Sequence, residues 1–158
     1  MRLLKILYIA SRKALEQSGK PIIGGSASAL ENGPLHSEIY DQIRGTAPDA
    51  QWRCYFRNSG HTVELLSDPG RLDLSPFEID ILQETAEWAE QFETFELSRW
   101  THDNLFEYQK NEPAAGGSNP IVVNDILEAL HFTEVEMQGV MDNHHAHSSL
   151  LSSLERVK

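Results

Sequence analysis

The chain has 158 residues, of which 40% are hydrophobic and 23% charged, and this composition is typical of one folded domain with its own core. The longest early apolar run, residues 6–10, is far shorter than the roughly 20 residues of a transmembrane helix, so we expect no membrane span. The single cysteine, Cys54, cannot form an internal disulfide, which favours a reducing, cytoplasmic location.

The net charge of −11 is unevenly distributed along the chain. Residues 1–72 carry 9 basic and 7 acidic side chains, whereas residues 73–158 carry 4 and 17. Nucleic-acid phosphates are bound by clustered Lys and Arg, so we expect no nucleic-acid partner and favour a basic protein. A helix-turn-helix over residues 121–141 is disfavoured because no Lys or Arg occurs between Lys110 and Arg156.

The first third of the chain predicts two helices separated by a short extended segment. Apolar residues at helical spacing indicate a buried helix over residues 2–18, and we do not interpret it as a signal peptide because Lys5 interrupts its apolar stretch. An extended piece near residues 27–31 and an Asn-Gly-Pro turn at 32–34 lead to a second helix. Tyr40 is expected to lock that helix to the core, and its replacement by Ala would then cost about 3 to 5 kcal/mol.

Residues 52–66 predict a β-hairpin. Trp52, Cys54 and Phe56 stand at alternate positions, and a turn separates them from the β-prone segment 61–66. In such a strand Cys54 is expected to be a core residue that reacts slowly with thiol reagents.

The second half of the chain is predicted to be helical. A serine, proline and glutamate at residues 75–78 form a capping box, and Thr94 can cap the next helix. Asn119 and Pro120 are interpreted as another cap and first turn, and Thr133 opens the last helix. The expected helices extend over residues 75–88, 94–100, 119–130 and 133–140.

The fold class expected from these elements is α+β and predominantly α-helical, with a small β-hairpin or short antiparallel sheet. We expect residues 1–158 to form a single compact domain, in which residues 142–158 are a C-terminal extension, helical or frayed.

No group of residues matches a known catalytic motif. His102 and Asp103, with Glu107 one turn later, could supply a general base, but no nucleophile motif accompanies them. The histidine-rich segment 143–147 could bind a divalent metal, although its spacing matches no metalloenzyme motif. The glycines match neither phosphate-loop nor dinucleotide spacing. The residues alone therefore indicate neither a catalytic set nor a cofactor site.

Five segments in order resemble the Panacea (SocA-like) antitoxin domain of type II toxin–antitoxin systems. They are KILYIASR at 5–12, GKPI at 19–22, NGPLHSEIYD at 32–41, LSPFE at 74–78 and LSRWTH at 97–102. The resemblance covers about residues 3–141. Ser11 stands where the family usually has Asp, and Phe106 and Tyr108 occupy the Pro and Trp positions of its LPEW motif.

The resemblance implies a non-enzymatic, largely helical domain that neutralises a cognate toxin, encoded beside it, by direct protein contact. It implies mainly structural roles for the motif residues Tyr8, Gly33, Pro34, Ser37, Tyr40, Thr101 and His102. Acidic side chains steer a basic partner and aromatic anchors contribute affinity, so the candidate contact residues are Glu87, Glu90, Glu93, Trp100, Phe106 and Tyr108.

Two other functions stay open at the level of sequence. One is an interaction protein of a phage or mobile element that has no toxin, because a domain match does not assign a partner. The other is a metal-dependent hydrolase that uses His102 and Asp103. The toxin's identity, the mode of neutralisation and the oligomeric state are not specified by the sequence.

Overall fold

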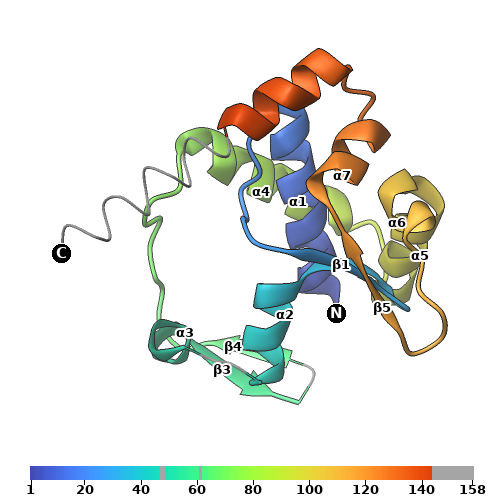
Figure 1. Ribbon diagram of the computed structural model, residues 1–158. Coiled ribbons are helices and arrows are strands. Elements are labelled where there is room, and N and C mark those ends of the chain that lie inside the picture. Colours follow the sequence, from blue (N-terminus) through green and yellow to red (C-terminus); the bar gives the residue numbers. More distant parts are fainter. Residues whose placement is uncertain (47–48, 61, 144–158) are drawn as a thin grey trace.

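Helix α1 (Arg2–Ser18) runs through the middle of the molecule, and most of the other elements pack around it (Figure 1). The computed structural model describes residues 1–46, 49–60 and 62–143. The predicted helix over residues 2–18 is confirmed, and it ends at Gly19, whose left-handed backbone (φ 71°) closes the last turn. Its buried side chains include Leu4, Ile9 and Leu15.

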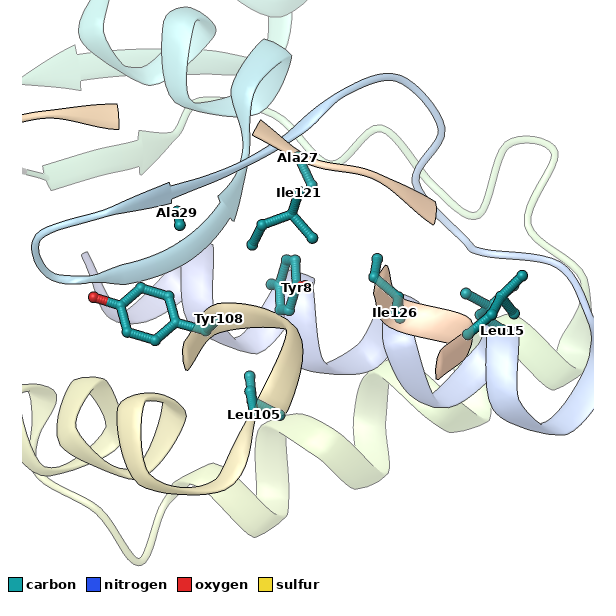
Figure 2. Close-up of a cluster of buried hydrophobic side chains, with 9 residues drawn as sticks. Tyr8, Leu15, Ala27, Ala29, Leu105, Tyr108, Ile121 and Ile126 are labelled. Atoms are coloured by element: carbon teal, nitrogen blue, oxygen red, sulfur yellow. The ribbon is translucent and has the colours of Figure 1, made fainter. Parts of the chain in front are cut away.

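A three-stranded antiparallel sheet packs against α1. Its central strand is β1 (Ala27–Leu30), flanked by β2 (Gly33–His36) and β5 (Ser118–Ile121). Figure 2 shows how the two layers meet, with Tyr8 of α1 pointing towards Ile121 of the sheet. All four residues of β2 are buried, so this sheet forms one wall of the main core.

Strand β5 replaces the helix start that was predicted at Asn119 and Pro120, and that prediction was wrong. Pro120 lies opposite Ser28 of β1 in an edge strand. Proline is tolerated in an edge strand because the open side of the strand does not require an N–H donor. Helix α7 (Val123–Ala129) begins just after the strand, and the Asp125 carboxylate accepts a hydrogen bond from the Val122 backbone N–H (3.4 Å).

Residues 37–75, which we call the arm, extend away from the rest of the described chain, which we call the body (Figure 1). The arm contains four elements and a return loop to the body. No side chain among its described residues is buried. The elements are α2 (Ser37–Arg44), α3 (Ala50–Tyr55), β3 (Phe56–Ser59) and β4 (Thr62–Leu65).

The hairpin of the arm is shorter than predicted, because residues 50–55 form a helix. The Asp49 carboxylate caps α3 by accepting a hydrogen bond from the Trp52 backbone N–H (2.6 Å). Trp52 and Phe56 are four residues apart, and their rings stack with centroids 4.5 Å apart. Cys54 is exposed on this helix, so its expected place in the core was wrong.

Tyr40 is half-buried rather than buried. Its hydroxyl oxygen accepts a hydrogen bond from Arg44 (3.4 Å), and the Arg44 guanidinium lies 5.4 Å from the ring centroid. Both contacts are within α2, and because the ring is only half-buried, the cost expected for a fully buried ring does not apply.

Three further helices in the second half cover the other side of α1. They are α4 (Pro76–Ala89), α5 (Thr94–Asn104) and α6 (Phe106–Lys110). The capping box at Ser75 and Glu78 is confirmed in both directions (3.3 and 2.7 Å), whereas the N-cap of α5 is Glu93 and not Thr94. Residues 134–143 form the predicted last helix. The predominantly helical α+β fold with a small antiparallel β element is therefore confirmed.

Candidate functional site

The end of α4 and the start of α5 form an acidic corner, which we define as residues 87–96. Glu87, Glu90 and Glu93 are all exposed there. The corner is attached to α1 by Arg2, whose guanidinium donates hydrogen bonds to the carbonyl oxygens of Ala89 (2.7 Å) and Phe92. The structure therefore places the three predicted glutamates, all exposed, in one segment that Arg2 attaches to α1.

Aromatic side chains support the corner from beneath. Trp88, Phe92 and Trp100 are half-buried, with the Trp88 ring centroid 4.8 Å from that of Trp100 and 4.9 Å from that of Phe92. Such contacts between aromatic rings stabilise a fixed arrangement. Trp100 therefore acts mainly as a packing residue beneath the corner and offers a partner only part of its surface.

Phe95 is the exposed aromatic side chain of the corner, and the sequence prediction missed it. It is 75% exposed, although it stands only two positions before the fully buried Leu97. Two residues correspond to about 200° around a helix, so Phe95 lies on the face opposite the buried stripe formed by Leu97 and Thr101. That position out of phase with the apolar stripe is the signal that could have identified it.

The other two predicted aromatic contact residues differ sharply. Phe106 is 55% exposed on α6 and is accessible to a partner. Tyr108 is only 1% exposed, and its hydroxyl donates a hydrogen bond to the Leu30 carbonyl oxygen (3.1 Å). Tyr108 is thus a core residue that links α6 to β1 (Figure 2), and the expectation that it is an exposed contact was wrong.

A groove of about 630 Å³ lies between the arm and the body, next to the corner. Its residues come from the start of α1, the end of α2, β4 and the start of α5. The apolar members are Met1, Leu3, Leu4, Ile43, Val63 and Phe95. Phe95 thus belongs both to the acidic corner and to the groove, so the two form a continuous surface.

Glu107, which the sequence analysis considered together with His102 and Asp103, is completely buried. Its Oε1 accepts hydrogen bonds from Arg12 Nε (2.7 Å) and the Tyr8 hydroxyl (3.3 Å). Burial, with the nearby Glu107 carboxylate, holds the pKa of Tyr8 well above its usual value. The contacts join α1 to α6 and give Glu107 a structural role.

The postulated general base is not assembled. His102 stacks on Tyr108, with ring centroids 4.4 Å apart, and burial lowers its pKa. Its Nε2 has no hydrogen-bond partner among the described residues, and Asp103 is exposed. Glu107 is directed to Arg12 instead of His102, so these three residues do not form a catalytic set.

Several motif residues form a polar contact beneath the β1–β2 turn. Lys5 is 2% exposed, and its Nζ donates a hydrogen bond to the Pro34 carbonyl oxygen (2.8 Å). Gly33 adopts φ 97°, and a Cβ atom there would lie 2.5 Å from Thr101 Oγ1 and 3.0 Å from Lys5 Nζ. Thr101 in turn donates to the Ser98 carbonyl oxygen (2.6 Å). Only glycine fits at position 33, which supports a structural role for this motif.

A small pocket of about 50 Å³ lies between α1 and the segment that leads into β1. His36 lines it and is 7% exposed, and neither ring nitrogen has a partner among the described residues. Burial lowers the pKa of His36 to about 4, so the ring is neutral at pH 7. A pocket of this volume has room for a few water molecules and is too small for a metabolite.

Ser11, which departs from the family pattern, and Ser37, which matches it, both make local hydrogen bonds. The Ser11 hydroxyl donates to the Ile23 carbonyl oxygen (3.4 Å) and accepts from the Ile23 N–H (3.2 Å), so a single serine satisfies both groups. The Ser37 hydroxyl lies 2.9 Å from the Ser28 hydroxyl and ties the start of α2 to β1.

Over residues 1–46, 49–60 and 62–143, no three His, Cys, Asp or Glu side chains gather as a metal site would require. No helix in the same ranges is both long and apolar enough to cross a bilayer. The histidines of the postulated metal site, at positions 144, 145 and 147, lie outside the described residues, like most of the C-terminal extension.

Comparison with known protein families gives one match, to the family described as "Antitoxin SocA-like, Panacea domain", over residues 3–106. Comparison with curated proteins and with solved structures finds no significant match. The matched range is shorter than the resemblance noted over residues 3–141, but it includes α1, the β1–β2 turn, the arm and the acidic corner. It also covers more than half of the chain, and the protein therefore belongs to the family of SocA-like antitoxins that have a Panacea domain.

Proposed function

We propose that this protein is an antitoxin that neutralises a cognate toxin, encoded next to it, by direct contact in the cytoplasm. The observation that carries the proposal is the family match over residues 3–106. The predicted catalytic residues His102, Asp103 and Glu107 are directed to different partners or to solvent, which favours a binding protein over an enzyme. The toxin is proposed to be basic, because the exposed corner carries several glutamates.

The acidic corner is proposed as the part of the surface that attracts the toxin. Glu87, Glu90 and Glu93 are exposed and lie within seven consecutive residues, so their electrostatic fields should add and raise the rate of encounter with a basic partner within about one Debye length. Phe95 and Phe106 are the exposed aromatic side chains that can contribute affinity.

Co-expression with the neighbouring gene product in a bacterial host tests the proposed function. We expect the neighbour to arrest growth when expressed alone and growth to be restored when this protein is co-expressed. A purified complex of the two proteins would establish direct contact. A neighbour that is harmless alone, or whose toxicity is unchanged by this protein, would contradict the antitoxin function.

The role of the corner is tested by the triple variant E87K/E90K/E93K. We expect its association with the toxin to slow by at least about tenfold at low ionic strength, and the difference to shrink as salt is added. The matched control is E16K/D73K/E134K, which makes the same change in net charge at exposed acids elsewhere. Equal association rates for the two variants would contradict a specific role of the corner in attracting the toxin. Thermal melts confirm that both variants fold.

A further inference from the structure

We propose that the groove between the arm and the body is the toxin's docking site, and that its occupant is a toxin segment with apolar side chains flanked by Lys or Arg. This inference rests on the proposed antitoxin function and adds to it the location and chemistry of the contact. It is carried by three observations: the exposure of the groove's apolar side chains, the lack of buried contacts in the arm, and the charge around the groove.

Three of the six apolar side chains that line the groove are exposed, whereas Leu4 is buried and Ile43 and Val63 are half-buried. Phe95 is 75% exposed, Leu3 43% and Met1 42%. Together with Ile43 and Val63 they line one continuous groove, whose volume is about 630 Å³. Contiguous apolar patches of this kind mark protein-binding surfaces, whereas single exposed apolar residues are ordinary.

The arm has no buried side chain of its own among the described residues 37–75. It nevertheless supplies Ile43 from α2 and Val63 from β4 to one side of the groove, opposite Leu3 and Phe95 of the body. A segment in the groove would contact both sides at once. It would therefore supply the arm with apolar contacts that the free protein does not provide.

The glutamates of the acidic corner, which adjoins the groove, favour a basic occupant. The described lining residues carry two cationic groups, the N-terminal amine of Met1 and the Arg2 guanidinium. Burial and the nearby Lys5 lower the pKa of the amine, which reduces its charge, and the guanidinium is occupied by the carbonyl oxygens of Ala89 and Phe92. These carbonyls lie at and just beyond the end of α4, where the helix dipole is negative, so the charge of Arg2 is partly compensated. Exposed Glu90 and Glu93 precede Phe95 by five and two residues in the chain, and exposed Glu96 follows it directly. Lys or Arg residues beside an apolar anchor would face this acidic edge.

The test compares Phe95→Ala with Phe77→Ala in binding assays with the purified toxin. Phe77 is also an exposed phenylalanine (39%), but it lies at the opposite end of α4 and outside the groove. We expect Phe95→Ala to weaken the Kd by at least about tenfold, as loss of an aromatic anchor does, and Phe77→Ala to leave it unchanged. Phe95 is largely exposed, so its replacement leaves the fold intact, which a thermal melt verifies.

A second measurement reads the position of the toxin directly. Photo-crosslinking amino acids are placed at Val63 on the arm and at Phe95 on the body. We expect both to label the same short toxin segment, and that segment to contain apolar residues next to Lys or Arg. Labelling of distant toxin segments, or of an acidic segment, would contradict the proposal.

The outcomes separate this inference from the proposed function. If the wild-type protein binds and neutralises the toxin while Phe95→Ala binds equally well, the groove is not the docking site but the antitoxin function stands. If the wild-type protein does not bind the neighbouring gene product, both proposals fail. If sedimentation shows that the wild-type protein is a dimer and Phe95→Ala a monomer, a second copy of the chain occupies the groove and the toxin does not.

Discussion

Lys5 is a cationic residue in an almost completely buried position, and its charge is disfavoured there. Burial lowers its pKa from 10.5 to about 7. Between these two pH values the unfolded chain holds a proton that the folded chain does not, so folding becomes more favourable as the pH rises. Below about pH 7 both states carry the charge and the penalty is constant, and above about pH 10.5 neither does.

We predict that the difference in unfolding free energy between Lys5→Met and the wild type depends on pH. The advantage of Met over Lys should be greatest below pH 7 and should shrink by up to about 1.4 kcal/mol per pH unit between pH 7 and pH 10. Comparing the two proteins at each pH cancels the titration of the other groups. Urea denaturation at several pH values measures the difference in unfolding free energy between the two proteins. A difference that does not change with pH would show that Lys5 has an ordinary pKa.

Glu107 provides a second prediction at the residue scale. The pair that it forms with Arg12 is mostly buried, with side-chain exposures of 0% and 17%. Removing one charge of a buried pair leaves the other uncompensated, so Glu107→Gln should lower the free energy of unfolding by about 3 kcal/mol. The control is Glu64→Gln, because the exposed Arg57–Glu64 pair (3.3 Å) should contribute less than about 1 kcal/mol. Similar losses in the two variants would contradict the prediction.

Among the secondary-structure elements, α3 shows that a local cap can override a β-like pattern. The alternation of Trp52, Cys54 and Phe56 is typical of a strand, but the Asp49 cap and the stacking of Trp52 on Phe56 stabilise a helix instead. The same residues therefore occupy different environments from those expected. The half-buried rings lie on one face, while Cys54 is exposed.

This placement of Cys54 makes a direct prediction about its reactivity. In the native protein the thiol should react with a small thiol reagent within about tenfold of its rate in the denatured protein, because no packing excludes the reagent. Kinetics of labelling under both conditions provide the measurement. Protection of a hundredfold or more would contradict this prediction, because it would mean that Cys54 is buried.

For the whole molecule, the division into body and arm is the feature with the clearest consequences. The body has a core built from α1, the sheet and the later helices, whereas the described arm residues are at most half-buried. Local opening costs little where few apolar contacts are lost. The arm should therefore exchange its amide hydrogens faster than the body.

Hydrogen exchange followed by mass spectrometry tests this prediction. We expect peptides from α2, α3 and the β3–β4 hairpin to exchange at least about tenfold faster than peptides from α1 and α5. The two regions are compared within one protein and one experiment, so solvent conditions are matched. Equal protection of the arm and α1 would mean that the arm is as stable as the body.

Much of the architecture was predictable from the sequence because it depends on interactions between near neighbours. The periodicity of α1 and the Ser75–Glu78 capping box of α4 are local signals, and the structure confirms both. The predicted turn at 32–34 does not lead directly into a helix, because Gly33 and Pro34 pair with β1 in strand β2 and α2 begins only at Ser37. Five motifs in order indicated the family that the comparison shows. The exposed glutamates of the corner were also predicted.

The remaining features were decided by contacts between residues far apart in the chain. Pro120 lies in a strand because β1, about 90 residues earlier, offers an edge for pairing, and no local signal reports that edge. Glu107 is buried because Arg12 and Tyr8 satisfy it across 95 and 99 residues, and Tyr108 is buried because it reaches Leu30. A polar or aromatic side chain can be stable either in solvent or beside a distant partner, and only the tertiary structure shows which of the two it has.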